Sequence, residues 1–455
     1  MIDINKNKYL YLTSIIILLA IFTFLTIPKK SEIKSTNKLT ATIINTTSNK
    51  ITVQDEKNII YTFSVEKNNL EPGTEIIIEY SGLLDKNQEL QTTNLIDISP
   101  VSQDEEEITP RSKNNLFSQF DTLALNKLKE MTLDEKIGQI ILTHYTNDNY
   151  EEAIEKYKVG GFLFLEENFQ NKTKEEVKSM INKSQEKTKI PLLTAENEEG
   201  GEVVSISSNN KIRESSFLSP RELYLKGGFD LIASDTQEKS LLLENLGLNI
   251  NLAPVVDVST NKTDYMYNRT LGEPTELVSQ YAKTVIEANK KTLVSYVLKY
   301  FPGHGNDKKV YMGEVTDKRT KEEIEKNDFP PFESGIKSGA EAILIGHNIV
   351  QSMDQNNPAS LSASVHNILR NELGFNGIIV TDDLSMAAIS KIESATIKAI
   401  LAGNDIIITN DYKTSFNEIK KAVEEKIISE ELIDNIVQRI ISWKYYKGLM
   451  YNKIK

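Results

Sequence analysis

The sequence of 455 residues contains no cysteine. This absence excludes disulfide bonds, thiolate zinc sites, a cysteine nucleophile and an anchor lipidated on cysteine. Histidine is almost as scarce, since only four occur, at positions 144, 304, 347 and 366, and no His-Glu-x-x-His pattern is present. We therefore expect neither a metal site nor a cofactor.

Positive charge is also in short supply. Lysine and arginine total 53 against 65 aspartates and glutamates, which gives a formal net charge of −12. A protein that binds nucleic acid needs a surplus of cations to neutralise phosphates, so we expect no nucleic-acid partner. The composition is otherwise that of an ordinary globular protein, with 39% hydrophobic and 26% charged residues.

Charge is absent altogether from one run near the start of the chain. Tyr9 to Ile27 comprises nineteen uncharged residues, enough to cross a bilayer as a helix. No small-residue cleavage pattern follows it, so we expect an uncleaved transmembrane signal-anchor in residues 1–34. A buried core helix is the alternative. The flanking lysines do not favour an outward main domain, because slightly more of them follow the span than precede it. The function argued below nevertheless predicts a single-pass protein of the cell membrane with its main domain on the extracellular side.

Residues 35–100 consist of short β-rich runs punctuated by Asn, Asp and Gly. They predict a small all-β module of about five strands, and a small barrel is one form it could take. The module offers no chemistry, so we interpret it as a spacer or docking module. Residues 101–115 are polar and acidic with one proline, which predicts a linker. The main β-rich runs are Leu39–Ile44, Lys50–Val53, Ile59–Val65 and Glu75–Tyr80.

From about residue 116 onward, apolar strand-like runs alternate with helix-like segments. Eight such units in about 340 residues indicate an α/β fold, a (β/α)8 TIM-like barrel over residues 116–455. A doubly wound open sheet is the alternative, but no glycine-rich phosphate-binding loop follows any strand. The expected strands are Ile137–Leu142, Gly161–Leu165, Pro191–Ala195, Ile250–Val256, Leu293–Leu298, Ala342–Gly346, Gly377–Thr381 and Asp405–Thr409. The expected helices include Thr173–Lys187, Glu276–Lys290, Lys321–Ser338 and Val365–Leu373.

In such a barrel the carboxyl ends of all strands meet on one face. The run Gly377–Thr381 leads directly into Asp382 and Asp383. These two acids are therefore expected at the site, and capping of the next helix by Asp383 or Ser385 is the alternative. Other polar residues after the predicted strands are Glu196, Asn197, Glu198, Glu199, Asp257, Asn268, Arg269, Lys299, Tyr300, His304, His347, Asn348, Asn410 and Asp411.

This set is rich in carboxylates, amides and single cations, which suits a neutral, hydroxyl-rich ligand, that is, a sugar. A carboxylate in such a pocket can attack an anomeric carbon. Two structural alternatives stay open. Lys299 could be a barrel-interior lysine paired with Glu199, and His304 a structural donor in a Pro-Gly turn.

Several motifs, taken in order, resemble glycoside hydrolase family 3. The resemblance covers about residues 120–450, and the most similar subgroup is the single-barrel β-N-acetylglucosaminidases (β-N-acetylhexosaminidases) that act on cell-wall fragments. It implies a retaining mechanism with Asp382 as nucleophile and with Arg269 and Lys299 on the sugar hydroxyls. With these we place Asn197, Tyr300 and His304 in the substrate-binding set. The motifs are Leu128–Gln139, Glu198–Gly201, Asn251–Val258, Lys299–Gly305, Pro358–Ser362, Leu373–Gly377 and Val380–Met386.

The chain departs from the pattern of this subgroup at several positions. The subgroup carries Asp-Ser-His on the loop after Pro-Gly-His-Gly, and its histidine acts as the general acid/base. This chain has Val310, Tyr311 and Met312 at the nearest positions. In addition, Asn197 replaces a sugar-binding aspartate and Tyr300 replaces a histidine.

Two functional hypotheses follow from these departures. In the first, the chain is an active glycosidase of terminal β-N-acetylglucosamine in cell-wall glycan, and Glu314 or Asp307 supplies the proton. In the second, it is a catalytically impaired relative that binds cell-wall glycan while anchored to the membrane through residues 9–27.

Overall fold

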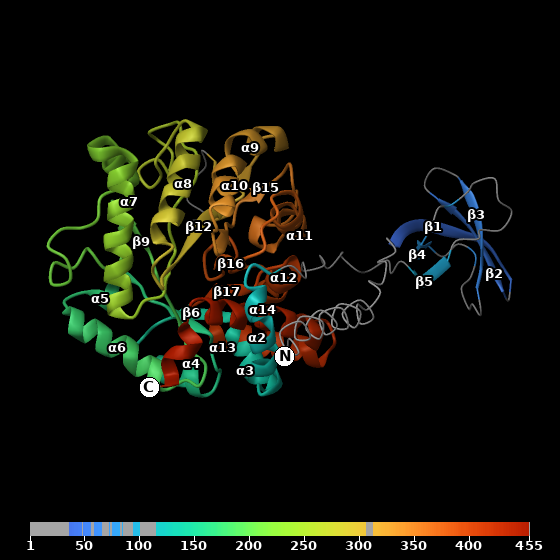
Figure 1. Ribbon diagram of the computed structural model, residues 1–455, viewed down its shortest axis with the longest axis horizontal. Coiled ribbons are helices and arrows are strands. Elements are labelled where there is room, and N and C mark those ends of the chain that lie inside the picture. The colour runs from blue at the N-terminus through green and yellow to red at the C-terminus, as the bar shows by residue number, and fades with distance from the viewer. Residues whose placement is uncertain are drawn as a thin grey trace, which may run out of the picture. The chain divides into compact units, whose positions relative to one another are not determined.

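The structure is a computed structural model that describes residues 36–47, 49–55, 59–65, 72, 75–81, 84, 94–100, 115–305 and 313–454 (Figure 1). The chain divides into two compact units, Met1–Glu106 and Glu107–Lys455. The predicted membrane span at residues 9–27 and nearly all of the predicted linker lie outside the described residues. Within the described ranges, no helix is both long enough and apolar enough to cross a membrane.

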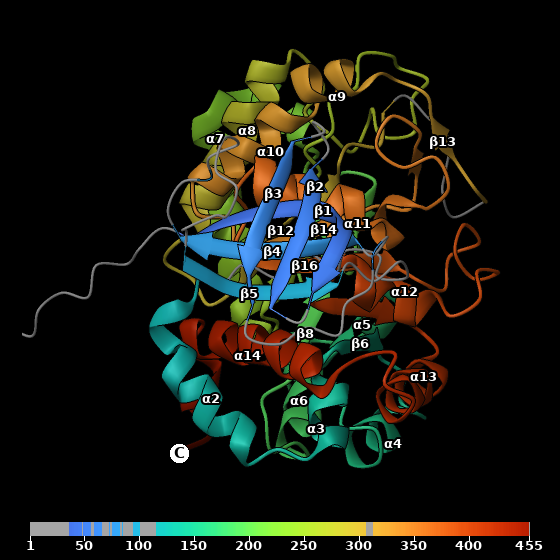
Figure 2. The same ribbon diagram turned by 90° about the vertical axis from the view of Figure 1, so that its right-hand side faces the viewer.

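The first unit is a five-stranded antiparallel sheet, as the β-rich composition predicts. Strand β1 (Thr36–Thr47) lies at its centre, and the order is β3-β2-β1-β4-β5 (Figure 2). Alternate residues such as Ile51, Val53 and Phe63 form its buried core. Among the described strands no pairing joins β3 to β5, so the sheet is open rather than a small barrel. The other strands are β2 (Lys50–Asp55), β3 (Ile60–Ser64), β4 (Glu75–Ser81) and β5 (Asn94–Pro100).

The second unit contains the predicted barrel of eight parallel strands. The barrel closes where β17 pairs with β6, with Ile408 opposite Leu142, and this closure rules out the doubly wound alternative. Apolar β-branched runs form these strands because each is covered on both sides. In chain order the strands are β6 (Ile141–His144), β7 (Gly161–Leu163), β8 (Leu193–Glu196), β11 (Ile250–Asn251), β12 (Ser295–Phe301), β14 (Ala342–Ile345), β16 (Ile378–Asp383) and β17 (Ile406–Thr409).

Helices surround the barrel, and α7, α8 and α10 follow one another along one side of it (Figure 1). Most begin at a side-chain cap, such as Ser219 with Glu222 at α7. The helices are α2 (Asp121–Lys129), α3 (Leu133–Gln139), α4 (Tyr150–Glu155), α5 (Glu166–Phe169), α6 (Lys174–Glu186), α7 (Pro220–Leu246), α8 (Thr275–Asn289), α9 (Lys321–Asn327), α10 (Phe329–Lys337), α11 (Ala363–Asn367), α12 (Ala395–Ala402), α13 (Tyr412–Glu424) and α14 (Glu430–Tyr446).

Short elements complete the second unit. Two pairs of short strands lie outside the barrel, and helical turns occur at the unit's start, in the loops and at its end. These elements are β9 (Glu198–Gly200), β10 (Val203–Val204), β13 (Thr316–Asp317), β15 (Ile349–Val350), η1 (Ser118–Phe120), η3 (Ala359–Leu361), η4 (Ile368–Glu372) and η5 (Leu449–Ile454).

Several predicted boundaries are wrong for local reasons. The first strand does not begin at Ile137, because Thr132 and Glu135 cap α3 reciprocally and the helix runs to Gln139. The expected strand Ile250–Val256 is paired as a strand only at its first two residues. Pro254 has no N–H with which to continue the ladder.

Two predicted helices are divided in the structure. The segment 321–338 contains α9 and α10, which meet at Asp328 just before a Pro-Pro pair. The segment 365–373 changes from α11 to a π-helical turn at Ile368.

Candidate active site

Residues at the carboxyl ends of the barrel strands form the candidate site. The pairing register decides which side chains point inward, because residues opposite one another on neighbouring strands share a face. Val297 lies opposite Ala342, which in turn lies opposite Ile378. Lys299 and Asp382 lie further toward the carboxyl ends of β12 and β16, where the register shifts between Leu298 and Phe301, so both belong to the same end of the barrel.

Glu199 binds two cations in the mouth of the barrel. Its Oε1 lies 2.6 Å from Lys299 Nζ and 2.6 Å from Arg269 Nη2, and its Oε2 accepts a hydrogen bond from Arg269 Nε at 2.9 Å. All three residues are buried. Burial alone would raise the pKa of Glu199, but Arg269 and Lys299 outweigh it and hold this pKa at about 2. Lys299 thus pairs with Glu199, as the structural alternative for this lysine holds, and Arg269 joins the same carboxylate.

The two cations keep capacity for a ligand. Arg269 uses four of its five N–H bonds, two to Glu199 and one each to the hydroxyls of Tyr265 (3.0 Å) and Tyr300 (2.7 Å). Lys299 uses two of three, one to Glu199 and one to Asn197 Oδ1 at 2.9 Å. Within the described residues, each cation thus retains one donor.

Asp382 lies near this cation cluster. It is 8% exposed, and its Oδ1 accepts a hydrogen bond from the backbone N–H of Asp383 at 2.9 Å. Burial is the main cause of the raised pKa of Tyr300, and the charge of Asp382 adds to the increase. A carboxylate and two cations with free donors therefore share one mouth.

The helix-cap interpretation of Asp383 and Ser385 is wrong. Asp383 Oδ1 accepts from the Ser385 N–H at 2.9 Å, and Ser385 Oγ accepts from the Asn410 N–H at 2.9 Å. Both contacts lie within loops, and the next helix, α12, begins only at Ala395.

His144, at the end of β6, is a site residue that the sequence did not reveal. Its Nε2 lies 2.8 Å from Asp383 Oδ2. In the sequence, His144 stands just after an apolar run. The predicted strand ended at Leu142, two residues before the end of β6, so His144 was not recognised as a strand-end residue. His347 supports the same segment, because its Nε2 lies 2.9 Å from the backbone oxygen of Asp383 and its Nδ1 2.8 Å from Ser360 Oγ.

His304 is buried beside the cluster, and its contact is made by the backbone. Its N–H donates to Asp257 Oδ1, whereas neither ring nitrogen has a hydrogen-bond partner among the described residues. The expected structural donor is thus the main chain and not the imidazole. Burial and then Arg269 lower the pKa of His304 to about 4, and burial raises that of Asp257 to about 7. Both groups are therefore neutral over part of the acidic range.

The structure describes only one of the two acids predicted as proton donors. Asp307 lies outside the described residues. Glu314 is exposed and precedes β13.

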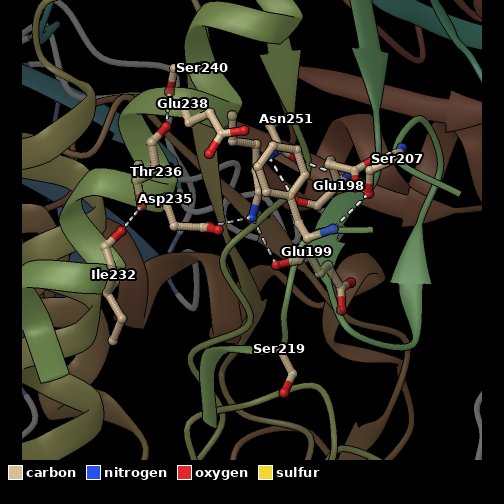
Figure 3. A network of polar contacts seen from close by, with 12 residues as sticks. Glu198, Glu199, Ser207, Ser219, Ile232, Asp235, Thr236, Glu238, Ser240 and Asn251 are labelled. Carbon is tan, nitrogen blue, oxygen red and sulfur yellow. Dashed lines mark hydrogen bonds and ion pairs between the residues drawn. The ribbon is translucent and has the colours of Figure 1, made fainter. Parts of the chain in front are cut away.

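Of the remaining acids after β8, Glu198 binds the segment after β10, and Glu196 has no hydrogen-bond partner among the described residues. Lys239 Nζ donates to the backbone oxygen of Glu199 (3.2 Å) and lies 3.3 Å from Asp235 Oδ2 (Figure 3). Glu198 accepts hydrogen bonds from the backbone N–H of Ile206 (2.7 Å) and from Ser207. Burial raises the pKa of Glu196 well above its usual range. Across the described residues, no group of three or more His, Asp or Glu side chains is arranged to hold a metal ion.

Comparisons with known proteins show which sequences and structures the chain resembles. The family described as Glycosyl hydrolase family 3 N terminal domain matches residues 132–443. Beta-hexosaminidase A of Pseudoalteromonas piscicida is 29% identical over 331 residues, which are 64% of this chain and 54% of that protein. Beta-hexosaminidase LpqI of Mycobacterium tuberculosis is 28% identical over 269 residues, which are 56% of this chain and 68% of LpqI.

A solved structure gives the same result. A glycoside hydrolase family 3 beta-N-acetylglucosaminidase from Paenibacillus sp. superposes with a TM-score of 0.66 at 27% identity, covering 70% of this chain and 63% of that one. The chain thus spans about half of the Pseudoalteromonas relative and just under two thirds of the Paenibacillus structure.

Proposed function

From the premise that the chain belongs to glycosyl hydrolase family 3, we propose that it hydrolyses terminal β-N-acetylglucosaminides of cell-wall glycan fragments. The reaction is a retaining one in which Asp382 attacks the anomeric carbon. Relatives named as hexosaminidases and a β-N-acetylglucosaminidase support the sugar class.

One observation carries the proposal: a buried carboxylate shares the mouth with two fixed cations. Glu199 fixes Arg269 and Lys299 in place, so a sugar hydroxyl that accepts their remaining N–H bonds meets donors that need no reorganisation. Held in this way, the sugar would present its anomeric carbon to Asp382.

The test is an assay with an aryl β-N-acetylglucosaminide and with a natural wall disaccharide, on the full chain and on Asp382→Ala. We expect turnover by the full chain and a loss of about 10⁴-fold or more in the variant, the scale seen when a nucleophile is removed. The matched control is Asp230→Ala. Asp230 is an exposed aspartate of α7 outside the candidate site, so its loss should leave kcat/KM unchanged.

The same assay decides between the two hypotheses. Binding of wall fragments without turnover of either substrate would favour the catalytically impaired relative. Absence of both turnover and binding would contradict both.

We also propose that residues 9–27 anchor the chain with the barrel outside the cell, because that is where wall glycan lies. Protease treatment of intact cells should then degrade the barrel. Protection until the cells are lysed would contradict this orientation.

A further inference from the structure

His144 and Asp383 are hydrogen-bonded to each other at the rim of the candidate active site. His144 Nε2 lies 2.8 Å from Asp383 Oδ2, and their side chains are 20% and 15% exposed. The two residues end strands β6 and β16, and Asp383 directly follows Asp382. An imidazole is thus coupled to the residue next to the proposed nucleophile.

The strand register turns His144 toward the interior of the barrel. Ile408 lies opposite Leu142 and Val380 opposite Ile406, so His144 shares the face of Val380. A register shift between Val380 and Asp383 places Asp383 opposite Ile408 as well. Consecutive acids of β16 therefore both reach the mouth.

The hydrogen bonds assign the protons of this pair. Burial is the largest single influence and would raise the pKa of Asp383, but the hydrogen bond and charge interaction with His144 and the hydrogen bonds from Ser385 together outweigh it and lower this pKa, so Asp383 is a carboxylate. A carboxylate only accepts, and therefore His144 Nε2 carries the hydrogen. Nδ1 is then the atom that can gain or lose a proton. Among the described residues, no group is hydrogen-bonded to it.

We propose that His144 is the general acid/base of this active site and that Asp383 is the residue that positions it. This inference rests on the proposed function. It assigns the proton donor to strand β6, whereas residues 306–315, the loop where the resemblance places this donor, contain no histidine.

The reaction balances with this assignment. In the first step, an Asp382 oxygen bonds to the anomeric carbon while the glycosidic C–O bond breaks. The departing oxygen takes the proton from Nδ1 of the His144 imidazolium and leaves as an alcohol. In the second step, neutral Nδ1 takes a proton from water, the water oxygen bonds to the anomeric carbon, and the bond to Asp382 breaks. The sugar is released with its configuration retained, and both residues return to their starting states.

The other histidines do not fit this role. Both ring nitrogens of His347 are engaged, by Ser360 and by the backbone of Asp383. His304 is 2% exposed and is neutral down to its pKa of about 4. His366 belongs to α11, and its Nδ1 lies 2.8 Å from the Ser362 carbonyl oxygen. Within the described chain, only His144 combines an inward position, partial exposure and an available nitrogen.

The test uses His144→Gln and His144→Ala in the full chain. The glutamine amide can still donate to Asp383 but cannot transfer a proton, so it separates catalysis from packing. For both variants we expect kcat/KM on the natural disaccharide to fall about 10²–10⁴-fold, the usual contribution of a general acid. On an aryl glycoside with a good leaving group, which needs little protonation, the fall should be less than about tenfold.

Azide provides a second readout, because it attacks the glycosyl-enzyme without needing a base. Added azide should accelerate turnover of the aryl glycoside by both His144 variants and yield the β-glycosyl azide, the product of two inversions at one carbon. Asp383→Asn should show a weaker form of the same behaviour, since it loosens the imidazole without removing it.

Three outcomes would overturn the inference while leaving the proposed function standing. In the first, His144→Gln retains full activity on the disaccharide. In the second, its losses are equal on both substrates without azide rescue, which indicates a structural role. In the third, Glu314→Gln or Asp307→Asn shows the leaving-group dependence instead. If the full chain hydrolyses neither substrate, or if Asp382→Ala has no effect, the proposed function itself fails.

Discussion

At the scale of single residues, the site depends on one carboxylate. Glu199 satisfies two buried cations at once, and its own charge is stable there only because both are present. Removing one member of such a group leaves the others buried without compensation, which costs far more than the net value of the interaction.

We predict that Glu199→Gln lowers the free energy of unfolding by about 3–5 kcal/mol, the usual cost of breaking a buried ion pair. Urea unfolding measures it. The matched control is Glu372→Gln, which removes an exposed partner of Lys321 and should cost less than about 1 kcal/mol. Equal losses in the two variants would contradict the prediction.

The lowered pKa of Glu199 also predicts that the free energy of unfolding depends on pH in the acidic range. The pKa of Glu199 is about 2 in the folded chain against an ordinary 4.5, because Arg269 and Lys299 outweigh burial. A lowered carboxyl pKa contributes stability that is complete above pH 4.5 and disappears as the pH falls toward 2. The unfolding free energy of Glu199→Gln should therefore fall less steeply over this window, in urea titrations at each pH, than that of the unmodified chain.

At the scale of elements, the turn after β12 packs against the ion pair between Asp328 and Arg319. Gly303 has a φ of +124°, and a Cβ there would lie 2.3 Å from Asp328 Oδ1. Asp328 Oδ2 in turn accepts a hydrogen bond from Arg319 Nη1 at 2.7 Å. The glycine is needed both for its backbone angle and for the space that it leaves.

We predict that Gly303→Ala lowers both stability and kcat/KM. Backbone strain of about 1–3 kcal/mol adds to the displacement of Asp328. The control is Gly374→Ala, with a φ of +68° but nothing within 4 Å of the new Cβ, which should cost only about 1 kcal/mol and leave activity intact. Thermal unfolding and the aryl glycoside assay compare them, and equal effects on both measures would count against the steric explanation.

The sequence predicted elements better than contacts. All eight barrel strands could be found because each is an apolar run with polar residues at its end. The predicted boundaries of β6 lay too early in the chain, and this error hid His144. The capping residues Thr132 and Glu135, which show that a helix precedes the strand, are visible in the sequence. The pairing of Arg269 with Glu199 joins residues 70 apart, and no local pattern specifies it.

At the scale of the whole molecule, the last helix secures the base of the barrel. Lys444 on α14 is buried, and its Nζ donates to Gln139 Oε1 (2.7 Å) and to the carbonyl oxygens of Gly160 (3.2 Å) and Pro191 (2.7 Å). These acceptors precede β6, β7 and β8. One side chain thus ties the end of the chain to the starts of three strands.

We predict that Lys444→Met destabilises the barrel by about 3–5 kcal/mol, because buried acceptors lose a charged donor at roughly 1–3 kcal/mol each. KM should not change, since Lys444 lies at the end of the barrel opposite the site. Lys420→Met, which removes an exposed pair with Asp134, is the control and should cost less than about 1 kcal/mol. A raised KM in Lys444→Met would contradict the prediction that Lys444 stabilises the barrel without affecting the candidate active site.

The closure of the barrel has a consequence for how the chain is made. Strand β6 is among the first barrel segments to leave the ribosome, yet its partner β17 and helix α14 are translated last. During most of synthesis, the nascent sheet therefore has an open edge at β6, the kind of edge that recruits other strands and aggregates. A polypeptide released before Ile406 would be a substrate for chaperones and proteases rather than a smaller enzyme.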